Sequence, residues 1–137
     1  MKINKQKILR VLDANFNRAK EGLRVCEDIC RFWLNDVKLS KGYKDIRHKL
    51  TEAINTLELK ALIASRDIEG DVGKGSSLSE KDRKGLSDIF FANSQRVKES
   101  TRVLEEFAKL LDKDISGRIK EVRYGAYDLE KKIAGRL

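Results

Sequence analysis

The sequence predicts an all-helical protein, a four-helix bundle made of two antiparallel helical hairpins in tandem. The 137 residues contain no proline, which permits long helices because proline breaks helix interiors. Apolar residues recur at spacings of three and four in four separate segments, as on one face of a helix. A polar motif of the first segment returns in the third. We therefore expect one helical domain, 1–137, built from a repeated unit.

The first hairpin is predicted over residues 4–64. Its first helix begins near Asn4, a residue type that favours helix N-caps, and extends to about Asn35. The apolar stripe of this helix is interrupted only at Asn15, and its members are Ile8, Val11, Leu12, Ala19, Leu23, Cys26, Cys30 and Trp33. The second helix begins near Ser40, and it or a short following turn reaches about Ala64. The two cysteines lie on the stripe with no histidine near them in sequence, so we expect core residues rather than zinc ligands.

A long loop is predicted over residues 65–79, which contain three glycines and four serines. The second hairpin follows over residues 86–134, with helices from about Leu86 to Leu111 and from about Ser116 to Ala134. Asn93 interrupts the apolar stripe of this hairpin as Asn15 does in the first. Short links between paired helices favour antiparallel packing, so residues 10–57 are expected to superpose on residues 88–133.

The repeat is the most informative motif, because its shared letters are mostly polar. Its first copy is Ala14-Asn15-x-x-Arg18-x-Lys20-Glu21-x-x-Arg24-Val25-x-Glu27-Asp28. It returns 78 positions later as Ala92-Asn93-x-x-Arg96-x-Lys98-Glu99-x-x-Arg102-Val103-x-Glu105-Glu106. Downstream, Lys44-Asp45-Ile46-Arg47-His48 resembles Lys120-Glu121-Val122-Arg123-Tyr124 at a distance of 76 positions. A repeat that only built a core would preserve apolar residues, so this pattern indicates a shared polar site.

A polar stripe on each motif helix carries the candidate catalytic residues, Arg18, Glu21, Arg96 and Glu99. Val25 and Val103 lie in line with these charges, so we expect the four side chains to share a crevice. One alternative is a structural ion-pair network, because Arg18–Glu21 and Arg24–Asp28 have helix-supporting spacings. Arg47 and Arg123 either bind a phosphate bidentately or cap that network.

The loop offers a candidate metal site. Asp67 and Asp71 are predicted magnesium ligands, and Asp67 is also a candidate catalytic residue. Arg66 flanks these acids, and the Gly73 amide could face a phosphate oxygen. The alternative is a surface linker.

The formal net charge of +8 favours an anionic partner, either nucleic acid or a phosphorylated small molecule. Acidic residues are interleaved with the basic ones on the motif helices, which argues against nucleic acid. No apolar run approaches the ~20 residues that span a bilayer. The basic N-terminus precedes no apolar segment, so we expect no signal peptide and a cytoplasmic protein.

Five segments in this order resemble the small hydroxymethylpyrimidine-phosphate kinases of thiamin synthesis. They are LDANFNRAKEGLRVCEDICRF, RHKL, ASRDIEGDVG, NSQRVKESTRVLEEFAKL and VRYGAYDLEKK, and they cover residues 10–133. That family occurs alone and fused ahead of thiamin-phosphate synthase, and the resemblance implies the stand-alone form here. It also implies an ATP-dependent phosphomethylpyrimidine kinase that converts 4-amino-5-hydroxymethyl-2-methylpyrimidine phosphate into the diphosphate.

The implied ligands are the phosphorylated pyrimidine, ATP and Mg²⁺. Bringing two anions together requires positioning and charge stabilisation, which the arginines and a magnesium ion would supply. Asn15 and Asn93 are expected to read the aminopyrimidine edge, because a side-chain amide both donates and accepts hydrogen bonds. The remaining predicted substrate- or ATP-binding residues are Arg47, Arg66, Gly73 and Arg123.

An alternative function is a non-enzymatic helical binding or adaptor protein for nucleic acid or a protein partner. Its polar stripes would then form a dimer interface. A homo-oligomer is also compatible with the kinase interpretation, with a site between subunits.

Overall fold

The computed structural model describes residues 3–75 and 81–137, and the regular elements over those residues are all helices, which confirms the prediction of an all-helical protein. Residues 76–79 of the predicted loop lie outside the described residues. In chain order the elements are α1 (Lys5–Asp28), the π-helix η1 (Ile29–Trp33), α2 (Val37–Ile54), α3 (Leu59–Ala64), α5 (Leu86–Ala108) and α6 (Lys113–Ala134). None of the helices in this part of the chain has the length and apolar character needed to cross a membrane.

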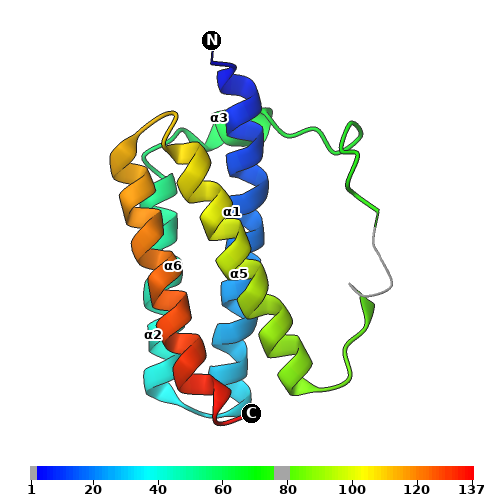
Figure 1. Cartoon of the computed structure of the whole chain (residues 1–137), viewed down its shortest axis with the longest axis vertical. Coiled ribbons are helices and arrows are strands. Elements are labelled where there is room, and N and C mark those ends of the chain that lie inside the picture. The colour runs from blue at the N-terminus through cyan, green and yellow to red at the C-terminus, as the bar shows by residue number, and fades with distance from the viewer. Residues whose placement is uncertain (1–2, 76–80) are drawn as a thin grey trace.

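The four long helices lie side by side, and each packs against two of the others. The principal contacts are α1 with α2 and α5, and α6 with α2 and α5. Neighbouring helices run in opposite directions, and the described residues between α3 and α5, 66–75 and 81–85, lie outside the four long helices (Figure 1). The core between them includes the fully buried residues Leu12, Leu23, Leu50, Leu104 and Ile119.

The first helix starts where the sequence predicts, because the Asn4 side chain accepts a hydrogen bond from the Lys7 amide. It ends differently. The α-helix stops at Asp28, and the chain winds into a π-helical turn before Asn35, which has a positive φ of 51°. The wider turn takes Trp33 off the apolar stripe, and this side chain is 68% exposed. Its assignment to the core stripe was therefore wrong.

Two later boundaries also differ from the prediction, and capping explains both. The helix α2 begins at Val37 rather than Ser40 because Asp36 accepts a hydrogen bond from the Leu39 amide at 2.8 Å. Similarly, α6 begins at Lys113 rather than Ser116 because Asp112 accepts one from the Asp114 amide. The helix α5 ends at Ala108, three positions before the predicted Leu111.

Both cysteines are buried, unpaired core residues, as predicted. Burial raises the pKa of the Cys26 thiol to about 12 and that of Cys30 to about 11. Both thiols are therefore protonated at neutral pH, which suits a packing role rather than a nucleophilic one.

Glycines allow the helices to approach closely. A Cβ atom on Gly22 of α1 would lie 2.8 Å from Val97 Cγ2 and 3.0 Å from the Asn93 carbonyl oxygen on α5. At the α2–α6 contact, a Cβ on Gly125 would lie 2.9 Å from Ile46 Cγ2. Gly22 belongs to the first motif, whereas Asn93 belongs to the second. The close approach at Gly22 therefore brings the two motif copies together.

Gly22→Ala should destabilise the protein, and Gly117→Ala provides the matched control. Alanine is favoured over glycine in helices by ~1 kcal/mol, and a Cβ on Gly117 meets no atom within 4 Å. We expect Gly117→Ala to be neutral or stabilising. Overpacking against the short Val97 side chain should make Gly22→Ala less stable than wild type by ~1–2 kcal/mol. Urea unfolding measures both, and a Gly22→Ala protein as stable as Gly117→Ala would contradict the close contact.

Candidate anion-binding site

A cleft of about 790 Å³ lies where α1 meets α5, and we call it the central cleft. It combines residues of both motif copies with residues of the segment between the two hairpins. Its lining consists of Asn15, Arg18, Gly73, Lys74, Gly75, Arg83, Ala92, Asn93, Arg96, Glu99, Ser100 and Val103. Four cationic side chains and one carboxylate belong to this set, so the cleft is suited to an anion.

The two motif asparagines make equivalent hydrogen bonds within their own helices. Asn15 Nδ2 donates to the Val11 carbonyl at 2.9 Å, and Asn93 Nδ2 donates to the Ile89 carbonyl at 2.8 Å. Each bond fixes the plane of its amide. The side-chain oxygen of Asn15 accepts a long 3.4 Å hydrogen bond from Arg18 Nη1. Asn15 is 5% exposed, so it interrupts the apolar stripe as a buried polar residue with local partners.

Arg18 and Arg96 occupy equivalent motif positions, and both line the central cleft. Both residues are exposed, and neither forms an ion pair within the described part of the chain. A guanidinium without a carboxylate partner can bind an external anion without first breaking a salt bridge. The sequence also placed Glu21 in this crevice. The structure places Glu21 in a neighbouring cleft with Lys20, Arg24 and other residues, so only Arg18, Arg96 and Glu99 of the four share the central cleft.

Buried carboxylates that the sequence analysis did not single out connect the helices of each hairpin. Glu27 on α1 is 3% exposed and accepts a 2.8 Å hydrogen bond from Arg47 Nε on α2. Arg24 approaches the same carboxylate at 3.2 Å. The alternative of an ion-pair network considered Arg24 beside Asp28, whereas the structure pairs Arg24 with Glu27, on the face that meets α2. One feature of the sequence could have pointed to this buried carboxylate, because Glu27 is one of the residues that the repeat retains, as Glu105.

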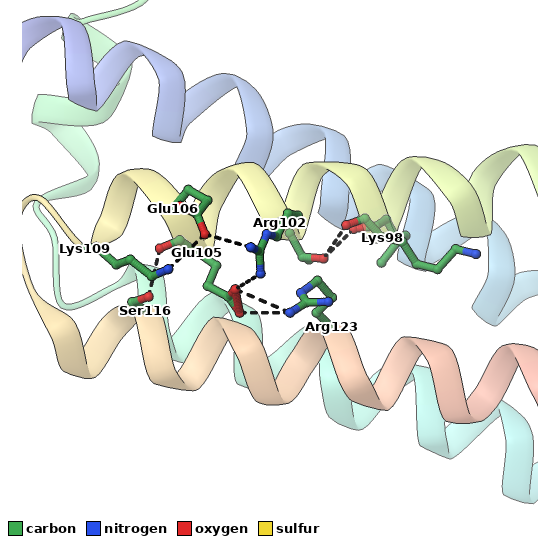
Figure 2. A network of polar contacts seen from close by, with 9 residues as sticks. Lys98, Arg102, Glu105, Glu106, Lys109, Ser116 and Arg123 are labelled. Carbon is green, nitrogen blue, oxygen red and sulfur yellow. Dashed lines mark hydrogen bonds and ion pairs between the residues drawn. The ribbon is translucent and has the colours of Figure 1, made fainter.

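The second hairpin contains the equivalent group (Figure 2). Glu105 on α5 is 3% exposed and pairs with Arg123 of α6 at 3.3 Å and with Arg102 at 2.8 Å. The Ser116 hydroxyl adds a 2.8 Å hydrogen bond to the Glu105 carbonyl. Arg47 and Arg123 therefore both belong to ion-pair networks, which is one of the two roles considered for them, and their role in phosphate binding stays a prediction.

The loop residues hold the chain to α1 and to itself. The Arg66 guanidinium donates two hydrogen bonds, at 2.8 and 2.9 Å, to the buried carboxylate of Asp13. Asp67 accepts the Gly70 amide, and Asp71 accepts the Gly73 amide, each at 2.8 Å. These are local turn interactions that need no metal ion. Across residues 3–75 and 81–137, no three His, Cys, Asp or Glu side chains come together as a metal site.

The chain belongs to the ThiD2 family, which matches residues 10–132. The thiamine-phosphate synthase of Rhodopirellula baltica is 43% identical over 93% of this chain and 36% of its own length. The proteins of the same name from Nostoc punctiforme and Thermosynechococcus vestitus are 40% and 43% identical over 95% and 92% of this chain. The chain spans about a third of the length of these curated relatives. No solved structure matches it.

These relatives place the chain in thiamin synthesis and correct the predicted activity. The sequence analysis expected an ATP-dependent phosphomethylpyrimidine kinase. The relatives are instead named for the synthase, which catalyses a condensation in the same pathway, so the kinase assignment was wrong. The stand-alone form is also not shown, because the region that matches this chain is a part of each relative. The resemblance identified the pathway correctly, but it did not identify the reaction.

Glu27→Gln and Glu105→Gln should each destabilise the protein, because each leaves a poorly exposed arginine without its carboxylate. Arg47 and Arg123 side chains are 15% and 11% exposed. Removing one partner of such a pair costs ~3 kcal/mol or more. Glu106→Gln is the control, since this carboxylate is 45% exposed and its loss should cost less than ~1 kcal/mol. Chemical denaturation measures all three, and equal costs at positions 27, 105 and 106 would refute the burial argument.

Proposed function

We propose that this chain acts in the formation of thiamin phosphate and binds a phosphorylated precursor in the central cleft. The observation that carries the proposal is the pair of arginines, Arg18 and Arg96, that face one cleft without carboxylate partners. The names of the relatives supply the pathway. The cleft supplies a reason for a phosphorylated ligand, because guanidinium groups match phosphate oxygens in both charge and geometry.

The surroundings of the arginines support an anionic ligand such as a phosphate ester. Lys74 and Arg83 extend the positive charge along one side of the cleft, while Glu99 contributes the single carboxylate. The backbone of Gly73 and Gly75 can approach a ligand closely, because these residues carry no side chain. An electropositive cleft of this kind would concentrate an anionic substrate from solution.

The organic part of the proposed ligand is an aminopyrimidine, as in 4-amino-5-hydroxymethyl-2-methylpyrimidine phosphate. Asn93 lines the cleft with its amide held by the Ile89 carbonyl, and its side-chain oxygen is an acceptor suited to an exocyclic amino group. Val103 and Ala92 offer apolar contacts to a ring and its methyl group. Binding of ATP and Mg²⁺, a homo-oligomeric site and a cytoplasmic location stay predictions.

We also infer that the four long helices form a bundle of two repeated hairpins related by a pseudo-twofold axis. The equivalent asparagine bonds support this, as do the matching groups around Glu27 and Glu105. Backbone superposition of residues 10–57 on residues 88–133 tests the inference. We expect the two hairpins to overlay along both helices with Arg47 on Arg123, and hairpins with different crossing angles would contradict it.

Arg18→Gln and Arg96→Gln should each weaken binding of the phosphorylated pyrimidine by at least about tenfold, or ~1.4 kcal/mol. Arg118→Gln is the matched control, because it removes the same charge from an exposed pair on α6, where the Arg118 side chain is 49% exposed. Isothermal titration calorimetry provides the Kd. The Kd of the unphosphorylated pyrimidine alcohol shows how much of the binding free energy is due to the phosphate. Unchanged binding in both cleft variants, or equal weakening in Arg118→Gln, would overturn the proposed site.

A further inference from the structure

The ion-pair groups around Glu27 and Glu105 have the same central carboxylate and arginines but differ in the charged residues next to them. Glu27 and Glu105 are equivalent, and each holds one arginine of its own helix and one of the neighbouring helix. Asp28 follows Glu27 as Glu106 follows Glu105, and Arg31 lies at the position equivalent to Lys109. These acids and bases have the same formal charges in the two hairpins, but they form ion pairs in only one of them.

In the second hairpin the additional charges neutralise one another. Glu106 pairs with Arg102 at 3.1 Å and with Lys109 at 2.9 Å, as Figure 2 shows. Arg102 therefore contacts two carboxylates, and Lys109 has a carboxylate of its own. Every cation of this group therefore has a carboxylate partner, which suits a structural role.

In the first hairpin the corresponding pairs are absent from the described residues. Asp28 is one methylene shorter than Glu106, and it forms no ion pair there. The Arg31 guanidinium lies 4.7 Å from the centroid of the Phe32 ring instead of beside a carboxylate. Arg24 and Arg47 share the carboxylate of Glu27, and Arg31 is left without a carboxylate partner in the described part of the chain.

A second cleft, of about 770 Å³, opens at this first group, and we call it the hairpin cleft. Its cationic lining residues are Arg24, Arg31, Lys41, Lys44 and Arg47. Each of its three acids is already engaged. Glu27 is covered by its two arginines, Asp45 pairs with Lys41 at 3.3 Å, and Asp36 caps α2 and pairs with Arg136. Arg31 and Lys44 have no ion-pair partner in the described part of the chain.

We propose that the hairpin cleft is a second anion site that binds the phosphate groups of a ligand, separate from the central cleft. Glu27 holds Arg24 and Arg47 in place, so their remaining N–H groups are oriented toward the cleft before a ligand arrives. Arg31 and Lys44 then supply charge that no carboxylate offsets. Several cations arranged around one cleft suit a diphosphate better than a single phosphate, because more oxygens can be contacted at once.

The repeat provides its own controls for a test with inorganic pyrophosphate. Arg31→Gln and Lys44→Gln remove the two unpaired cations, whereas Lys109→Gln and Lys120→Gln remove the cations at the equivalent positions of the second hairpin. Each of the four variants loses one positive charge, so all four have the same net charge. Binding is measured by titrating ¹⁵N-labelled protein at constant ionic strength, with the arginine Nε–H signals of Arg24 and Arg47 as reporters of the hairpin cleft.

We expect Arg31→Gln and Lys44→Gln to weaken pyrophosphate binding at these reporters at least about fivefold, and Lys109→Gln and Lys120→Gln to change it less than about twofold. Inorganic phosphate should bind more weakly than pyrophosphate. Equal effects in both hairpins would show general charge attraction and overturn the proposal. The proposal would also be overturned if pyrophosphate left the Arg24 and Arg47 signals unmoved.

Arg96→Gln tests whether the two sites are separate, because it should impair the central cleft and leave the Arg24 and Arg47 signals unchanged. If Arg96→Gln abolishes the response, the hairpin cleft is not an independent site.

Discussion

A carboxylate buried between two helices organises each half of this protein. Glu27 connects α1 to α2 through Arg47, and Glu105 connects α5 to α6 through Arg123. A carboxylate that is 3% exposed is costly unless cations and hydrogen bonds compensate its charge. The pairs therefore restrict the register in which each hairpin can pack, since sliding one helix along the other would leave the acid without its arginine. The apolar core supplies most of the favourable free energy, but it is less selective for register.

The register of the hairpins also determines what the motif helices present to each other. With α2 and α6 held on one side, α1 and α5 meet at Gly22, where the helices come too close for an additional methyl group. This contact brings Asn15 and Arg18 into one cleft with Asn93 and Arg96. The spacing that the two motif copies share therefore serves two purposes. One face of the helix carries the buried acid, and another carries the arginines that remain without carboxylate partners.

The two copies of the repeat differ more in their ion pairs than in their architecture. Both copies keep the buried glutamate, its two arginines and the asparagine bond to the preceding helical turn. They differ at Asp28 and Glu106, because Glu106 pairs with Arg102 and Lys109 whereas Asp28 forms no ion pair in the described part of the chain. The two copies carry the same formal charge, but only the first has a cation, Arg31, that lines a cleft without a carboxylate beside it. Duplicated elements can acquire separate roles in this way without a change of fold.

The sequence by itself determined the helical class, the repeat and part of the lining of the central cleft, because helical periodicity and repeated letters are local properties of the chain. Glu21 was placed there wrongly, and Lys74 and Arg83 were not predicted. The resemblance of five segments indicated thiamin synthesis, although not the reaction. Tertiary structure alone decided which charges pair. Arg24 could reach either Asp28 or Glu27 along its own helix, and in the folded protein it pairs with Glu27, which faces α2 and also pairs with Arg47. The exposure of Trp33 was likewise decided by a π-helical turn that no residue pattern indicates. Ion pairing depends on which helix lies opposite, and that information is absent from the spacing within one helix.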